Sequence, residues 1–283
     1  MASLHAACVQ LCASRSVERN IADAEALIRA AAAAGARYVL TPEQTALMEL
    51  SREVLFSSIH AEDADPGLAR FRALARELGI WLHIGSLAIR VAEDKAANRS
   101  FLIAPDGAIA ARYDKIHMFD VDLAGGESYR ESKTYRAGSQ AVVGDMDDLK
   151  VGMTICYDLR FPYLYRALAK AGAALLTVPA AFTKQTGEAH WHVLLRARAI
   201  ETGCFVLAAA QGGHHENGRD TYGHSLIIDP WGVVLAEAET APGFIHAELD
   251  LGKVAAARNR VPSLTHDRDF TVATSIAREE AYS

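Results

Sequence analysis

Cysteine is scarce in this sequence, and the few cysteines do not form the patterns of a disulfide framework or a thiolate metal site. Four occur in 283 residues, at positions 8, 12, 156 and 204, and no two make a CxxC pair. Such usage suits a reducing compartment. The stretch 214–216 (His-His-Glu) lacks the HExxH spacing of a zinc helix and lies among Gly and Asn, so we expect a loop and no metal site there.

Long apolar runs and an excess of basic residues are also missing. No segment reaches the length needed to cross a bilayer, and the first predicted strand begins at residue 4 without a charged leader segment. Lys and Arg number 29 against 35 Asp and Glu, a formal net charge of −6 that argues against a nucleic-acid-binding surface. We therefore expect a cytoplasmic protein with neither a nucleic-acid nor a membrane partner.

What the sequence does contain is an alternation of strand and helix patterns, within a composition that is ordinary for globular proteins. The predicted strands are 4–10, 38–41, 80–89, 100–104, 108–113, 141–143, 151–155, 173–178, 204–210, 225–228, 233–236 and 244–249. Predicted helices begin near residues 16 and 66 and cover 162–171, 188–202 and 253–260, while 114–139 is predicted to be a long polar loop. The pattern indicates an α/β fold in a single domain over residues 1–283, with 262–283 as a C-terminal tail.

The two halves of the chain have similar element orders, since each contains strand–helix units and a hairpin centred on Pro and Gly. This suggests internal pseudo-symmetry, although no sequence repeat accompanies it. Helices outside two mixed sheets would make a four-layer α-β-β-α sandwich, which the periodicity suggests without fixing the number of layers.

One segment, from Val151 to Pro162, carries the strongest chemical signal. Apolar residues alternate and end on Cys156, and Pro162 then opens a helical pattern. A cysteine at the carboxyl end of a strand lies where α/β sheets bind ligands, and the N–H groups after it are available to an anion. The alternative is a buried cysteine that acts as a small hydrophobic residue.

Two other residues stand in similar places. Glu43 follows the strand 38–41, and Lys115 follows the first hairpin inside the long loop, a kind of segment that is often functional. Alone, each is more often an ordinary surface residue. Together with Cys156 they make chemical sense, because a carboxylate can take the thiol proton while the ammonium and the N–H of Tyr157 hold an oxyanion. This cycle requires no metal and no organic cofactor. A Cys–His pair stays open, since histidines occur at 117, 190, 192 and 224.

The chain resembles the nitrilase superfamily of carbon–nitrogen hydrolases over nearly its full length. The resemblance rests on three segments in the same order, namely 41–43 (Thr-Pro-Glu), 113–117 (Tyr-Asp-Lys-Ile-His) and 152–162 (Gly-Met-Thr-Ile-Cys-Tyr-Asp-Leu-Arg-Phe-Pro). It implies the four-layer sandwich, and it implies a role for each of four residues: Glu43 as general base, Lys115 as stabiliser of the tetrahedral intermediate, Cys156 as nucleophile and Glu131 as a supporting glutamate.

Segments 180–182, 189–201 and 222–232 resemble the branch that contains deaminated glutathione amidase and omega-amidase. This implies a cysteine-dependent amidase that cleaves a small carboxamide through a thioester, in a homodimer or larger homo-oligomer. Deaminated glutathione is the favoured substrate, and 2-oxoglutaramate-type amides and N-carbamoyl compounds are the alternatives. The non-enzymatic alternative is a catalytically silent binding protein on the same fold. Glu188 and His192 replace the proline and glutamate usual in this branch, which bears on the substrate.

Arg160 follows the predicted nucleophile by four residues. A guanidinium there can bind a substrate carboxylate through two parallel hydrogen bonds. An ion pair with Asp158 or Glu201 is the alternative. By resemblance, Phe182 and Thr186 line the same pocket.

Overall fold

Two six-stranded mixed sheets form the centre of the molecule. The computed structural model describes residues 3–123, 126 and 128–273. The first sheet has the order β16-β1-β2-β3-β4-β5, built from Gly243–Asp250, Ser3–Gln10, Tyr38–Leu40, Trp81–Arg90, Ala96–Ile103 and Ile109–Asp114. The second has the order β15-β14-β11-β10-β9-β8, built from Val234–Glu237, Leu226–Ile228, Phe205–Ala208, Leu175–Thr177, Leu149–Met153 and Val142–Met146.

The sheets repeat one pattern of strand directions, which agrees with the suggested pseudo-symmetry. In the first sheet β1, β2 and β3 run parallel, and the remaining neighbours pair antiparallel. In the second sheet β9, β10 and β11 run parallel, again flanked by antiparallel pairs. Each half therefore places the carboxyl ends of three parallel strands at one edge, where α/β sheets bind ligands.

Side-chain alternation along the strands separates an inner core from an outer one. On β1, Ala6 and Cys8 belong to the inner core with Val151 and Met153 of the other sheet. The intervening Ala7 packs instead with residues of the helices outside the first sheet. The two sheets thus face each other across a shared apolar layer.

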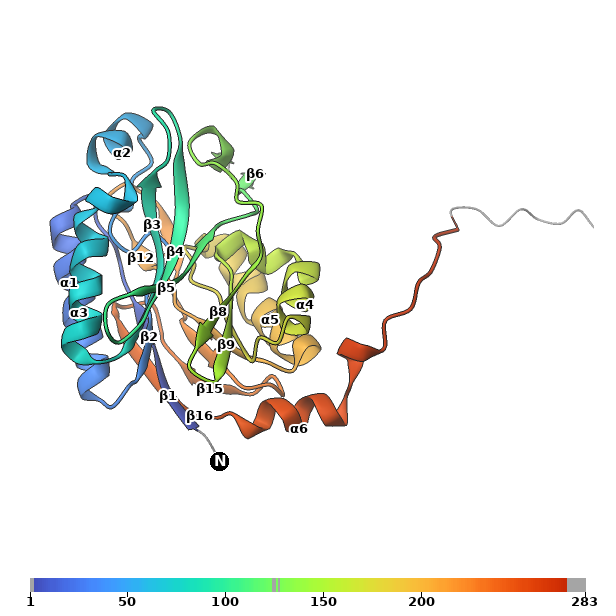
Figure 1. Cartoon of the computed structure of the whole chain (residues 1–283). Coiled ribbons are helices and arrows are strands. Elements are labelled where there is room, and N and C mark those ends of the chain that lie inside the picture. The colour runs from blue at the N-terminus through green and yellow to red at the C-terminus, as the bar shows by residue number, and fades with distance from the viewer. Residues whose placement is uncertain (1–2, 124–125, 127, 274–283) are drawn as a thin grey trace, which may run out of the picture.

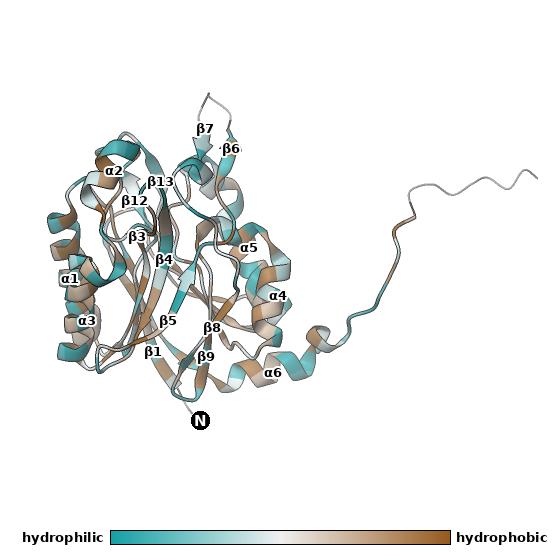
Figure 2. Cartoon of the chain, turned by 45° about the horizontal axis from the view of Figure 1, so that its top comes forward, coloured by the Kyte–Doolittle hydropathy of each residue, from teal (hydrophilic) through white to brown (hydrophobic). Residues whose placement is uncertain are grey.

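Helices cover both outer faces and complete four layers (Figure 1). Those outside the first sheet are α1 (Val17–Ala33) and α3 (Pro66–Leu78), and those outside the second are α4 (Pro162–Lys170) and α5 (Lys184–Thr202). Figure 2 shows mixed hydropathy along α1 and α3, as expected of helices with one buried face. The predicted four-layer α-β-β-α sandwich is confirmed.

Several element boundaries differ from the predicted ones. Helix α5 begins at Lys184 rather than 188, because the Thr183 side chain caps it by accepting the N–H of Thr186. The predicted loop 114–139 contains two short paired strands, β6 (Asp120–Asp122) and β7 (Ser128–Arg130), and a 3-10 turn, η3 (Glu131–Lys133). Other elements that were not predicted include α2 (Arg52–Ser58), η1 (Glu62–Ala64), β12 (Gly212–His214) and β13 (Asp220–Tyr222).

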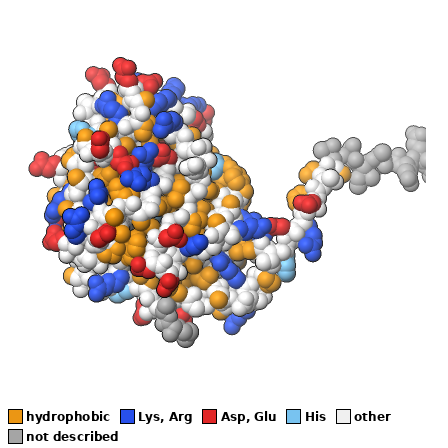
Figure 3. Space-filling model, in the orientation of Figure 1, with side chains coloured by type: hydrophobic (Ala, Val, Ile, Leu, Met, Phe, Trp, Pro, Cys, Tyr) orange, Lys and Arg blue, Asp and Glu red, His pale blue; other side chains and the backbone are white. Residues whose placement is uncertain are grey.

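The C-terminal part leaves the body of the molecule after α6 (Gly252–Arg260) and a turn, η5 (Ser263–Thr265) (Figure 1). Residues 274–283 of the predicted tail lie outside the described residues. Among the described helices, none is long and apolar enough to cross a bilayer. Figure 3 shows acidic and basic side chains interspersed over the viewed face.

A glycine lets the ends of the two sheets approach each other. Gly85 lies in β3 where the pairing with β4 shifts register. An added Cβ would lie 2.0 Å from the carbonyl oxygen of Thr41 and 2.4 Å from Cβ of Pro179. Since the segments that follow β2 and β10 both pass this point, the fold depends on the missing side chain.

We predict that Gly85→Ala lowers the free energy of unfolding by about 2–3 kcal/mol, because backbone atoms must move to admit the methyl group. Gly243→Ala is the matched control, since a Cβ there would meet nothing within 4 Å. It should change stability by less than about 0.5 kcal/mol. Urea unfolding measures both, and equal effects of the two substitutions would contradict the proposed close packing.

Candidate active site

Glu43, Lys115 and Cys156, which the sequence places far apart, meet in one buried cluster. Lys115 Nζ lies 2.9 Å from Glu43 Oε1, and the Cys156 thiol lies near enough to the Glu43 carboxylate for each group to shift the pKa of the other. The other carboxylate oxygen, Oε2, accepts the N–H of Ala181 at 2.9 Å. None of the three is more than 7% exposed. The carboxylate therefore pairs with an ammonium and lies near a thiol, away from bulk water.

Strand ends bring these side chains together. Glu43 follows β2, Lys115 follows β5 directly, and Cys156 comes three residues after β9. The first two therefore come from one sheet and the third from the other. The strand that precedes Cys156 ends at Met153 rather than 155, and a 3-10 turn, η4 (Cys156–Arg160), begins at the cysteine itself.

The backbone at Cys156 adopts a conformation that side-chain-bearing residues rarely take, with φ at 50°. Its N–H donates to the carbonyl of Pro179 at 2.9 Å, which fixes the turn against the segment after β10. Tyr157 is the second residue of the 3-10 turn, a position whose N–H has no acceptor inside the turn. Strain of this kind gathers at functional sites.

Lys115 lies between two carboxylates. Besides Glu43, its Nζ lies 2.8 Å and 3.0 Å from the two oxygens of Glu131. Asn98 joins both acids, since its Nδ2 donates to Glu43 at 2.8 Å and to Glu131 at 3.2 Å. Asn98 was not predicted as a site residue, because nothing in the sequence distinguishes it from other polar residues of a strand.

Charge and burial set the protonation of the cluster. Burial opposes ionisation of Glu43, but the neighbouring Lys115 outweighs it and the pKa of Glu43 is lowered. Burial also opposes the charge on Lys115, whose pKa is nevertheless raised well above its usual range by Glu131 and Glu43. The pKa of Cys156 is raised, first by burial and then by the charge of Glu43. The resting state is thus a carboxylate, an ammonium and a protonated thiol.

A cavity of about 320 Å³ opens onto the cluster. All eight predicted site residues line it: Glu43, Lys115, Glu131, Cys156, Tyr157, Arg160, Phe182 and Thr186. Among the described residues that line it there is no histidine, so a Cys–His pair is not supported. His117, one candidate, instead binds Asp158 at 2.7 Å and Tyr163 at 2.5 Å.

Arg160 does not form the alternative ion pairs. Asp158 accepts hydrogen bonds from Tyr113 and His117, and Glu201 pairs with Arg198 at 2.8 Å. The Arg160 guanidinium instead lies 5.3 Å from the ring centroid of Phe182, with its nitrogens 3.3 and 3.4 Å from a ring nitrogen of His190. Within the described part of the chain, Arg160 has no carboxylate partner.

Arg219 also lines the cavity and was not predicted. Its guanidinium donates to the carbonyl of Ala181 and lies 5.2 Å from the ring centroid of Tyr129. Burial raises the pKa of Glu43 and Lys115 lowers it. The charge of Arg219 lowers it further, by a smaller amount than Lys115. Arg219 follows the stretch 214–216 in sequence, and no motif around it indicates that the hairpin of β12 and β13 reaches the cavity.

Comparison with known proteins identifies the family. The model of a family described as carbon-nitrogen hydrolase matches residues 5–259. A deaminated glutathione amidase from Yersinia enterocolitica is 40% identical over 273 residues, which cover 95% of this chain and 94% of that protein.

Solved structures agree in fold. Saccharomyces cerevisiae Nit3, a member of branch 10 of the nitrilase superfamily, superposes with a TM-score of 0.84 at 30% identity and covers 95% of this chain and 97% of its own. A mutant amidase from Nesterenkonia sp. AN1 has a TM-score of 0.78 at 25% identity, over 91% of this chain and 94% of its own. That structure carries the acetamide moiety of fluoroacetamide on its active site cysteine.

We predict that Lys115→Met lowers the free energy of unfolding by about 3–5 kcal/mol at pH 7, because it leaves two adjacent carboxylates buried without a cation. The loss should shrink as the pH falls towards 5, since such a pair takes up a shared proton more readily in the folded state. Chemical denaturation at several pH values measures both effects.

Lys170→Met is the control, because Lys170 and its partner Asp267 are 45% and 52% exposed. This ion pair should contribute no more than about 1 kcal/mol to the free energy of unfolding. A loss for Lys115→Met as small as that of the control would contradict the buried cluster.

Proposed function

The chain belongs to the carbon–nitrogen hydrolase family, and we propose that it is a cysteine-dependent amidase whose substrate is deaminated glutathione. One observation carries the proposal: the Glu43 carboxylate pairs with the Lys115 ammonium at 2.9 Å, and both line one open cavity with the Cys156 thiol. These are the groups that amide cleavage through a thioester requires.

In the proposed cycle, the sulfur of Cys156 attacks the amide carbon as Glu43 removes the thiol proton. The negative charge that develops on the carbonyl oxygen is stabilised by Lys115 and by the N–H of Tyr157. The proton held by Glu43 passes to the leaving nitrogen, and the amine departs from a thioester. Glu43 then takes a proton from water, which attacks the thioester carbon. The C–S bond breaks, the carboxylic acid leaves, and the proton passes from Glu43 to the Cys156 sulfur, which restores the thiol. Glu131 keeps Lys115 in place throughout, through two contacts of 2.8 and 3.0 Å.

Arg160 is proposed to bind the substrate carboxylate next to the keto group. It lines the cavity, lies close to Cys156 in sequence, and has no carboxylate partner within the described part of the chain. A guanidinium that faces a cavity without a counter-charge favours anionic amides over neutral ones. Phe182 lies beneath the guanidinium, and Thr186 adds a hydroxyl group to the same wall.

We further propose a cytoplasmic homo-oligomer with one hydrolase domain. The four cysteines are free, which suits a reducing compartment. Val193 and Ile200 of α5 are 68% and 56% exposed, and the neighbouring hairpin adds Trp231 and Val233 at 53% and 50%. Apolar side chains gathered in this way favour contact with a second copy, and light scattering would measure the assembly.

The direct test compares kcat/KM for deaminated glutathione, 2-oxoglutaramate and an N-carbamoyl amino acid. We expect deaminated glutathione to be preferred, and Cys156→Ala to lower its turnover by at least about 10³-fold without unfolding the protein. Mass spectrometry of quenched reactions should find the acyl group on Cys156. Cys12→Ala is the control, because Cys12 lies outside the cavity lining.

Three results would count against this assignment. Preference for one of the other amides would overturn the proposed substrate but not the proposed nucleophile. An adduct on another residue would overturn the nucleophile, and a folded protein inactive on all three compounds would favour the silent binding protein.

We predict that Arg160→Met lowers kcat/KM for substrates with a keto-acid carboxylate by roughly 10–100-fold, the value of a charge-assisted hydrogen-bonded pair. A neutral amide of similar length should be hydrolysed equally by the wild type and the variant. Arg160→Lys should lie between them, because the charge remains while the paired geometry is lost. A uniform loss on charged and neutral amides would instead indicate a role in folding or in orienting Cys156.

A further inference from the structure

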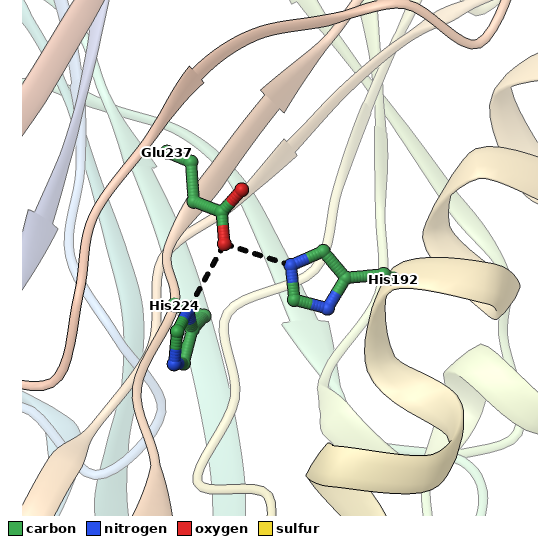
Figure 4. A group of neighbouring side chains, drawn as sticks. All are labelled: His192, His224 and Glu237. Carbon is green, nitrogen blue, oxygen red and sulfur yellow. Dashed lines mark hydrogen bonds and ion pairs between the residues drawn. The ribbon is translucent and has the colours of Figure 1, made fainter.

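A second cluster of ligand-type side chains lies apart from the cavity (Figure 4). It joins His192 of α5, His224 just before β14 and Glu237 at the end of β15. Nitrogen Nε2 of His192 lies 2.9 Å from Oε1 of Glu237, and Nδ1 of His224 lies 3.0 Å from the same oxygen. One ligand atom from each residue lies within 4.8 Å of the others.

We propose that these three side chains bind a divalent first-row transition metal ion, for which zinc is the natural probe. Two imidazoles and one carboxylate suit such ions, and they leave coordination positions open for water. Metal–ligand bonds are about 2.0–2.2 Å long, so donors up to about 4 Å apart can share one ion. The separations of 2.9 and 3.0 Å to Glu237 fall within that limit. The two imidazole nitrogens lie within 4.8 Å of each other, so they would move slightly closer on binding, and the ion would replace the two hydrogen bonds to Glu237.

The charges in the cluster favour a cation. Glu237 forms its ion pairs only with the two histidines among the described residues, and no Lys or Arg pairs with it. With neutral imidazoles the group therefore carries one negative charge. The side chains of His192, His224 and Glu237 are 32%, 25% and 41% exposed, so an ion can reach them from solvent.

The backbone holds His224 ready for a ligand. Its N–H donates to the carbonyl of Glu239 at 2.8 Å, and its own carbonyl accepts Nε1 of the buried Trp191 at 2.7 Å. It also adopts a left-handed backbone conformation with φ at 52°. The Tyr222 ring stacks on its imidazole at 4.4 Å between centroids. Because Trp191 precedes His192 on α5, one helix supplies the first ligand and fixes the second.

An ion here would tie α5 to the hairpin of β14 and β15. The first turns of the same helix carry Thr186 at the cavity and His190 beside Arg160. Metal binding would therefore stiffen a helix that forms part of the cavity wall. This inference concerns a different site from the proposed hydrolysis, and its test does not use amidase activity.

The test begins with wild-type protein stripped by a chelator and dialysed. Titration calorimetry with zinc chloride, and elemental analysis after equilibrium dialysis, should find one zinc ion per chain. His192→Asn and Glu237→Gln should each weaken binding at least tenfold, since loss of a ligand exceeds the roughly 10–100-fold effect of losing its supporting residues. Zinc should raise the Tm of the wild type but not of these two variants.

His214→Asn is the matched control, because His214 also pairs with a carboxylate, that of Asp220 at 2.8 Å, but on the exposed hairpin of β12 and β13. It should bind zinc as the wild type does. Absence of stoichiometric binding to the wild type would overturn the proposal and leave a hydrogen-bonded trio. Equal affinity in the wild type and in both ligand variants would also overturn it, by assigning the ion to other residues.

Discussion

The position of Lys115 between Glu43 and Glu131 is the constraint on which the rest of the site depends. None of these three charges would be stable in the protein interior alone, because each would lose hydration without compensation. Together they join the end of β2, the end of β5 and the turn that follows β7. Asn98 extends the network to β4, and the N–H of Ala181 brings in the segment after β10 of the second sheet. The network therefore connects the two sheets structurally as well as forming the proposed active site.

The repeated topology explains how two sheets serve one cavity. Each sheet has three parallel strands, and their carboxyl ends meet at the same edge. One sheet supplies the carboxylate and the ammonium, and the other supplies the thiol on its strained turn. Since Gly85 lets these ends approach, the distance between the Glu43 carboxylate and the Cys156 thiol depends on packing at a position that has no side chain.

The sequence was enough to single out candidate site residues at strand ends that the fold brings to one cavity, but it did not single out the cavity residues placed there by long-range packing. Cys156, Glu43 and Lys115 could be found because strand periodicity stops beside each, and the matched family segments supported them. Asn98 sits in the middle of β4, and Arg219 reaches the cavity from a hairpin, so neither has a local signal. The start of α5 was placed four residues late, because the apolar period begins well after the Thr183 cap. Whether Arg160 pairs with Asp158 or Glu201 depends on which side chains lie close together in the fold, so only the structure could exclude these ion pairs.

The raised pKa of Cys156 also bears on how this thiol survives in a cell. Peroxides react with thiolates, and they oxidise exposed, easily ionised cysteines first. A buried thiol with a raised pKa presents almost no thiolate to such oxidants. In the proposed cycle, where Cys156 reacts only as Glu43 removes its proton, the same burial would separate reaction with substrate from oxidative damage.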